Sequence, residues 1–144
     1  TFEIQAIQHN SAQPPTIKIT SSGIIIHDVP LGITIADINN AASTIGKVKS
    51  ISLREKARWQ TAHVNFEETD KQLDIQNIWA ITIKKDSCRV YPKNNFLEIK
   101  EYRNQFISKL TNLSPGCTAY ELKQLLDKIK AKTCFIPHTR NKYN

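Results

Sequence analysis

Flat rings and guanidinium groups are the side chains of this sequence best suited to chemistry, and several lie between residues 54 and 66. Trp59 and His63 are four residues apart in the stretch RWQTAHVNF, on the same side of a strand, and Arg54 lies shortly before it. A ring that stacks on a base contributes about 1–3 kcal/mol, and guanidinium groups bind phosphates through their charge. The chemistry indicated is noncovalent recognition of single-stranded nucleic acid.

No catalytic or metal-binding constellation accompanies these side chains. The sequence has no glycine-rich phosphate loop, no G-x-S-x-G or H-E-x-x-H motif and no convincing pair of carboxylates. His27 and His63 have no evident carboxylate partner. Cys88, Cys117 and Cys134 are widely spaced without a C-x-x-C, which favours buried thiols in a reducing compartment. We therefore expect a protein that is not an enzyme and that needs no cofactor or metal.

The composition is that of a basic, soluble globular protein. Of the 144 residues 40% are hydrophobic, yet no run reaches the ~18 apolar residues of a membrane span, and the first residues do not show the pattern of a signal peptide. The net charge of +7 is uneven: residues 1–95 carry 11 Lys/Arg against 9 Asp/Glu, and residues 96–144 carry 9 against 4. A basic surface suits a polyanion. We expect an intracellular protein, nuclear or cytoplasmic, and the absence of Met indicates an excised fragment.

Strand and helix patterns alternate regularly between Gly23 and Pro92. Period-two alternation predicts strands at 23–30, 47–55 and 59–66 and a hairpin at 79–84 and 87–91; helical spacing predicts helices at 34–46 and 67–77. The order β-α-β-β-α-β is that of the α+β ferredoxin-like sandwich. In that fold two helices cover one face of a four-stranded antiparallel sheet, and the other face is open for function.

The remaining segments predict a connector and half of a second unit. Residues 93–105 read as a helical connector, and residues 106–144 repeat only the β-α-β opening of the first unit. Half a unit leaves strand edges unpaired, so we expect that the protein continues past Asn144 or that a partner or second copy completes the sheet. Residues 1–22 read as a strand and a linker, which could pair with a sheet edge or belong to an upstream domain.

The segment 23–92 resembles the RNA recognition motif (RRM) family. IIIHDV stands in the place of the family's first-strand motif, and WQTAHVNF in the place of its third-strand motif. KLTNLSPGCTAYEL is similar to the start of a second such domain. The resemblance implies a complete domain at 23–92, a partial one at 106–144, and binding of single-stranded RNA on the open sheet face.

The family's stacking positions correspond to Ile25, Thr61 and His63, and none of them is Phe or Tyr. The matching position of the partial domain is Lys109. Alternation along the strands places further rings and cations on the open face, and these are His27, Arg54, Trp59, Arg89 and Tyr91. We expect these displaced groups to replace the missing stacking pair.

Two alternatives to a cellular RNA-binding protein stay open at this point. The face could serve a protein–protein interaction module, and the helix-like FLEIKEYRNQF could itself lie across the first sheet. The chain could also be the nucleic-acid-binding part of a retroelement particle protein. Lys84, at the tip of the predicted hairpin, is either a phosphate contact or part of a solvated turn.

Overall fold

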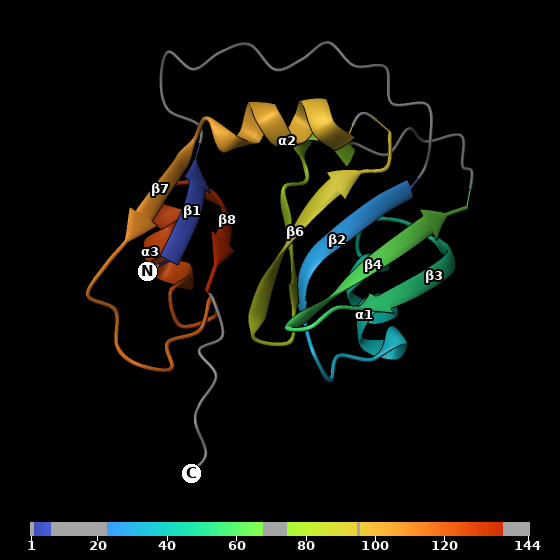
Figure 1. Ribbon diagram of the computed structural model, residues 1–144, viewed down its shortest axis with the longest axis horizontal. Coiled ribbons are helices and arrows are strands. Elements are labelled where there is room, and N and C mark those ends of the chain that lie inside the picture. Colours follow the sequence, from blue (N-terminus) through green and yellow to red (C-terminus); the bar gives the residue numbers. More distant parts are fainter. Residues whose placement is uncertain (1, 7–22, 68–74, 95, 137–144) are drawn as a thin grey trace.

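The computed structural model describes residues 2–6, 23–67, 75–94 and 96–136, and these form two antiparallel sheets (Figure 1). The larger sheet has five strands in the order β3-β4-β2-β6-β5. Its strands are β2 (Gly23–Pro30), β3 (Val48–Glu55), β4 (Trp59–Phe66), β5 (Ala80–Ile83) and β6 (Asp86–Pro92). The architecture is α+β and is compatible with a ferredoxin-like fold.

Helix α1 (Ile35–Ala42) covers one face of this sheet and begins at a well-formed cap. The backbone N–H of Asp37 donates to the Thr34 hydroxyl at 3.3 Å, and the Thr34 N–H donates to the Asp37 carboxylate at 2.9 Å. This reciprocal capping satisfies two donors that the first helical turn cannot satisfy itself. The helix then buries Ile38 and Ala42 completely against the sheet.

Strand alternation decides which side chains face α1. Ile24, Ile26, Ala62 and Val64 are fully buried in the core, while their neighbours in sequence point to the opposite face. Gln60 is buried on the α1 side as well, and its amide donates to the carbonyls of Pro30 and Ile33 at 2.9 and 3.1 Å. The side chain of Gln60 therefore fixes the loop that leads into α1.

A bulge interrupts strand β2 at Asp28. The pairing of β2 with β4 shifts between Ile26 and Val29, and Asp28 has a φ of 62°. The extra residue keeps Val29 on the core side, where it is fully buried. Strand β2 continues past the bulge to Pro30, the end that the sequence predicted.

The sheet has one strand more than the four of the ferredoxin-like sandwich, because both strands of the predicted hairpin join it. A two-residue turn, Lys84–Lys85, joins β5 to β6, and β5 pairs with β6 as an additional edge strand. The second predicted helix, at 67–77, lies mostly outside the described residues, which include only its last turn as a 3₁₀ segment (Ile75–Asn77). Ile75 is 1% exposed and packs in the core.

The smaller sheet joins the two ends of the chain in the order β7-β1-β8. Strand β1 (Phe2–Ala6) pairs antiparallel with both β7 (Ile107–Leu110) and β8 (Ala131–Phe135). Helix α3 (Lys123–Lys128) packs beside it, and a small core forms around Ile4, Leu122 and Cys134. The central strand of this second unit is therefore supplied by the chain itself, from residues whose role the sequence had left open.

Candidate nucleic-acid interface

The face of the larger sheet that points away from α1 is divided into two halves. Helix α2 (Phe96–Asn104), predicted as the connector, lies over β6, and β8 of the smaller sheet also packs against β6 (Figure 1). We call the part formed by β6 and the adjacent side chains of β2 the covered half. The part formed by β3, β4 and Lys93, just after β6, is the exposed half.

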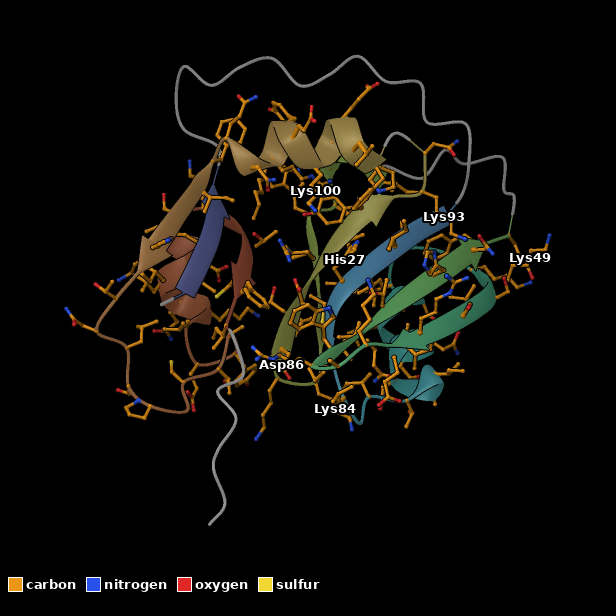
Figure 2. All side chains as sticks on the ribbon, in the orientation of Figure 1. His27, Lys49, Lys84, Asp86, Lys93 and Lys100 are labelled. Atoms are coloured by element: carbon orange, nitrogen blue, oxygen red, sulfur yellow. The ribbon has the colours of Figure 1, made fainter. Side chains whose placement is uncertain are left out.

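Aromatic rings fasten α2 to the covered half. The imidazole of His27 points from β2 toward α2 and stacks on Phe96, with ring centroids 5.4 Å apart (Figure 2). Tyr91 meets both rings edge-on, at 5.3 Å from His27 and 5.1 Å from Phe96. Such pairs stabilise packing by about 0.5–1.5 kcal/mol each beyond the area they bury. Tyr91 is 1% exposed as a result.

A buried arginine holds the other end of α2. Arg103 is 1% exposed, and its guanidinium donates to the carbonyl of Val90 and, at 3.2 Å, to the carbonyl of Ile78. The same group lies 4.8 Å from the centre of the Trp79 ring and 5.1 Å from that of Tyr91. Burial lowers the pKa of Arg103 to about 10, so the side chain is still charged at neutral pH. This contact fixes the helix to the sheet.

Arg89 is also engaged within the protein. Its guanidinium forms a two-pronged ion pair with the carboxylate of Asp28, at 2.5 Å from Nε to Oδ2 and 3.0 Å from Nη2 to Oδ1. On the other side it lies 5.4 Å from the ring centre of Phe135 in β8. The left-handed backbone at Asp28 aims this carboxylate at β6, so the bulge supports the junction of the two units.

Rings and cations are accessible on the exposed half. Trp59 is 39% exposed at the beginning of β4, and Arg54 is exposed on the neighbouring strand β3. His63 lies farther along β4 and is half-buried. It pairs in register with Ser52 on β3. These three side chains form a strip along β3 and β4.

A polar bridge closes the other end of this strip. The ammonium of Lys93, just after β6, donates to the Asn65 side-chain oxygen at 2.6 Å, and the Asn65 amide donates to the Ser50 hydroxyl at 2.9 Å. Gly23 makes this possible, since a Cβ there would lie only 2.6 Å from Cδ of Lys93. The cation of Lys93 is thereby held over the sheet instead of extending into solvent.

The positive charge of the exposed half contributes to the lowered pKa of His63. The pKa of His63 is lowered by partial burial and further by the nearby cations Lys93 and Arg54. Residues 47–67 carry five Lys/Arg and two Glu, a net charge of +3. One of these cations, Lys47, pairs with Glu67 at 2.9 Å. The strip thus lies in a positive field that favours an anion.

The stacking positions that the RRM resemblance implies are only partly accessible. Thr61 is 5% exposed, and Ile25 and His63 are half-buried and pair directly in register across β2 and β4. Lys84 lies on the α1 side, 3.5 Å from the Asp37 carboxylate, and Lys109 is on β7 of the smaller sheet. The predicted site residues are therefore distributed over the exposed half, the covered half and two other surfaces.

A cleft opens at the end of the sheet where the two units meet. It has a volume of about 70 Å³. The larger sheet contributes Trp59, Arg58 and the first residues of β6, while β8 and the segment before α3 supply apolar side chains. The lining residues are Asp28, Arg58, Trp59, Asp86, Ser87, Ala119, Cys134, Phe135 and Ile136.

The described residues contain no cluster of three or more His, Cys, Asp or Glu side chains that could hold a metal ion. Comparison with family models, with curated proteins and with solved structures gave no match to this chain. Within the described ranges no helix has the length and apolar character needed to cross a membrane.

Sequence reasoning missed three parts of this region. Arg103 lies in a polar-looking helix, where an arginine is normally solvated, so only the surrounding Trp79 and Tyr91 could have indicated its burial. The Asp28–Arg89 pair depends on a bulge that the local pattern does not reveal. Lys93 was placed in the connector and was not recognised as part of the face. Trp79, at the start of the predicted hairpin, is also buried and is 5% exposed.

Proposed function

We propose that this protein binds single-stranded RNA with the exposed half of an RRM-like sheet. In this proposal Trp59 stacks on a base, and Arg54 and Lys93 bind phosphates at opposite ends of the strip. His63 and Ser52 lie between them and offer a ring edge and a hydroxyl to the bases. RNA-binding sheets commonly combine such a stacking platform with cations that follow the backbone.

The observation that carries the proposal is the partly exposed ring of Trp59 within a basic segment. Large rings are usually buried, and Trp59 keeps 39% of its surface accessible although it lies at the junction of two packed units. Arg58 beside it and Arg54 opposite Thr61 are both exposed, so cations flank the ring. A ring flanked by cations is suited to a base with its phosphates.

The covered half is left out of this proposal for an energetic reason. Displacing α2 would break the ring contacts of Phe96 and remove Arg103 from two carbonyls. Each hydrogen bond to a charged group contributes about 1.5–3 kcal/mol, which is comparable to the stacking that a base would give in return. His27, Arg89 and Tyr91 therefore act within the protein, and RNA is expected on β3 and β4.

Binding of a degenerate pool of single-stranded RNA, followed by fluorescence anisotropy at several salt concentrations, tests the proposal. Affinity should fall as salt rises, because bound phosphates release counterions. Trp59→Ala should weaken binding, whereas Tyr120→Ala, which removes a more exposed ring of the smaller unit, should not. Absence of binding at low salt would reject the proposal.

A protein-interaction module is the second candidate, and one observation favours it. The segment that could occupy the sheet face does lie on it, because α2 packs Phe96 on His27 and Tyr91. A face that already binds a helix of its own chain could bind a helix of another protein on its remaining half. A protein that binds no RNA but is retained by an immobilised protein partner through Trp59 would support this reading.

A further inference from the structure

A row of polar side chains crosses the sheet at the end of the exposed half that lies farthest from Trp59. Asn65 on β4 pairs in register with Gly23 on one side and with Ser50 on the other. The backbone N–H of Lys93 donates to the Gly23 carbonyl at 3.0 Å, so Lys93 extends the row beyond β2. Because Gly23 has no side chain, the Lys93 ammonium reaches over it to Asn65. We call Lys93, Asn65 and Ser50 the donor row.

The hydrogen bonds within the donor row fix how its groups are oriented. The Lys93 ammonium can only donate, so the Asn65 oxygen faces it at 2.6 Å, and the Asn65 NH₂ group faces the Ser50 oxygen at 2.9 Å. An ammonium has three donor hydrogens and an amide NH₂ has two, so each group uses one here and keeps at least one more. The Ser50 oxygen accepts in this row, which leaves its hydroxyl hydrogen to donate. Donors of three different side chains therefore lie together in a fixed order.

The donor row is accessible and lies in a positive field. Ser50 is exposed, and Asn65 and Lys93 are half-buried. Lys49, exposed beside Ser50, adds a second cation, and Figure 2 shows it at the same end of the sheet as Lys93. The charge of Lys93 also contributes to the lowered pKa of His63, one step along β4. Converging donors next to free positive charge suit an anion with several oxygens, such as a phosphate.

Two features favour the last phosphate of a strand over a phosphate within it. A terminal phosphate monoester has three acceptor oxygens and about two negative charges at neutral pH, whereas a phosphate within the strand has one fewer free oxygen and about one charge. The donor row can satisfy the larger number. Just past the row β4 ends, and Glu67 follows with its carboxylate 2.9 Å from the Lys47 ammonium. A further phosphate in that direction would meet this carboxylate.

We infer that the donor row binds the phosphate monoester at one end of a single-stranded RNA, so that this protein recognises phosphorylated RNA ends. In this arrangement the rest of the strand runs along β3 and β4 toward Trp59. The inference rests on the proposed function, because it assumes that RNA lies on the exposed half. It adds a preference for the chemical state of the strand end, which stacking and general charge do not provide.

Three forms of one ten-nucleotide uridine RNA, with a phosphate at the 5′ end, at the 3′ end or at neither end, test this inference on the wild-type chain. Fluorescence anisotropy measures their affinities. We expect one phosphorylated form to bind about tenfold more tightly than the form without a terminal phosphate, which corresponds to one hydrogen bond to a charged group. The other phosphorylated form should gain little, because a bound strand places only one of its ends on the donor row.

A substitution in the donor row locates the preference. Asn65→Asp replaces a donor with a carboxylate that repels the phosphate, so the affinity ratio of the preferred form to the unphosphorylated form should fall to about one. Asn40→Asp, the same change at an exposed position of α1 on the other face of the sheet, should leave the ratio unchanged.

The outcomes separate the inference from the proposed function. A preference for the 5′ or for the 3′ phosphate supports the inference and identifies the end that is bound. If all three RNAs bind in a salt-dependent way with equal affinity, or both phosphorylated forms gain equally, the inference is overturned and the proposed function stands. If none of them binds at low salt, both are overturned. If the preference is unchanged in Asn65→Asp, with its thermal unfolding like that of the wild type, the phosphate is not bound by the donor row.

Discussion

The covered and exposed halves belong to one sheet face, yet the side chains of one half pack against α2 and those of the other are accessible to solvent. On the covered half Tyr91 and His27 present rings, and the chain that leaves β6 returns Phe96 onto them. On the exposed half β3 presents Ser52 and Arg54, which gain little from burial and are left in contact with solvent. The aromatic positions of this face are used for internal packing, so the proposed RNA recognition depends on cations and on Trp59.

Electrostatics separates the two halves in the same way. Burial is the main cause that lowers the pKa of His27, to about 4, with Asp28 opposing the shift. The pKa of His63 is also lowered, with Lys93 and Arg54 adding to the effect of partial burial. The pKa shift of His27 thus reflects mainly its packing against neighbouring side chains, whereas that of His63 also reflects the positive charge around it.

The largest expected effect of a substitution is on the covered half, at Arg103. Arg103→Met should lower the free energy of unfolding by about 2–4 kcal/mol, because the carbonyls of Val90 and Ile78 lose their charged donor. Urea unfolding measures the change. The matched control, Arg54→Met on the exposed half, should change stability by no more than about 0.5 kcal/mol. Equal effects of the two substitutions would show that α2 is not anchored in this way.

On the exposed half, Trp59→Ala should weaken binding of single-stranded RNA by about tenfold, which corresponds to the loss of one stacking contact. Titration of a labelled RNA pool by fluorescence anisotropy measures the change. Tyr91→Phe removes only a buried hydroxyl from the covered half and should leave affinity unaltered. A larger loss of affinity with Tyr91→Phe than with Trp59→Ala would reverse the assignment of the two halves.

The lowered pKa of His27 predicts a pH dependence of stability. The folded-state pKa of His27 lies near 4, below its usual value of 6.5, so the unfolded chain takes up the proton first as the pH falls. His27 should therefore lower stability progressively between about pH 6.5 and pH 4, and have no such effect above that range. Unfolding curves of the wild type and His27→Phe should diverge in this window. Parallel curves throughout would show that His27 is solvated.

The smallest expected effect distinguishes the two sides of the sheet. Arg54→Met should weaken RNA binding a few-fold and reduce the slope of log affinity against log salt by about one, as for the loss of one phosphate contact. Lys84→Met removes the same charge from the α1 side, near Asp37, and should alter neither quantity. A reduced slope for Lys84→Met alone would place RNA on the opposite face.

Local sequence patterns predicted the elements of the larger sheet well. Period two placed Gln60, Ala62, Val64 and Phe66 toward the helix side, and all four are buried there. The helix predicted to begin at residue 34 does begin there, with Thr34 as the N-cap of α1. These features depend on neighbours in sequence, which is why the sequence alone revealed them.

Contacts between distant segments were harder to predict. Pairing of β1 with β7 and β8 joins residues about a hundred positions apart, and nothing in the alternation of residues 2–6 specifies those partners. The division of the sheet face has the same origin, because the burial of Tyr91 depends on the path of α2. Thus the candidate residues were identifiable by type, and their accessibility was not.

An NMR titration of the chain with single-stranded RNA tests the central claim most directly. The account predicts chemical-shift changes at Arg54, Trp59 and His63 on the exposed half, with the signals of Tyr91 and Phe96 unchanged. Changes concentrated on Tyr91 and Phe96, or no changes at low salt, would contradict the claim that RNA binds the exposed half while α2 stays in place.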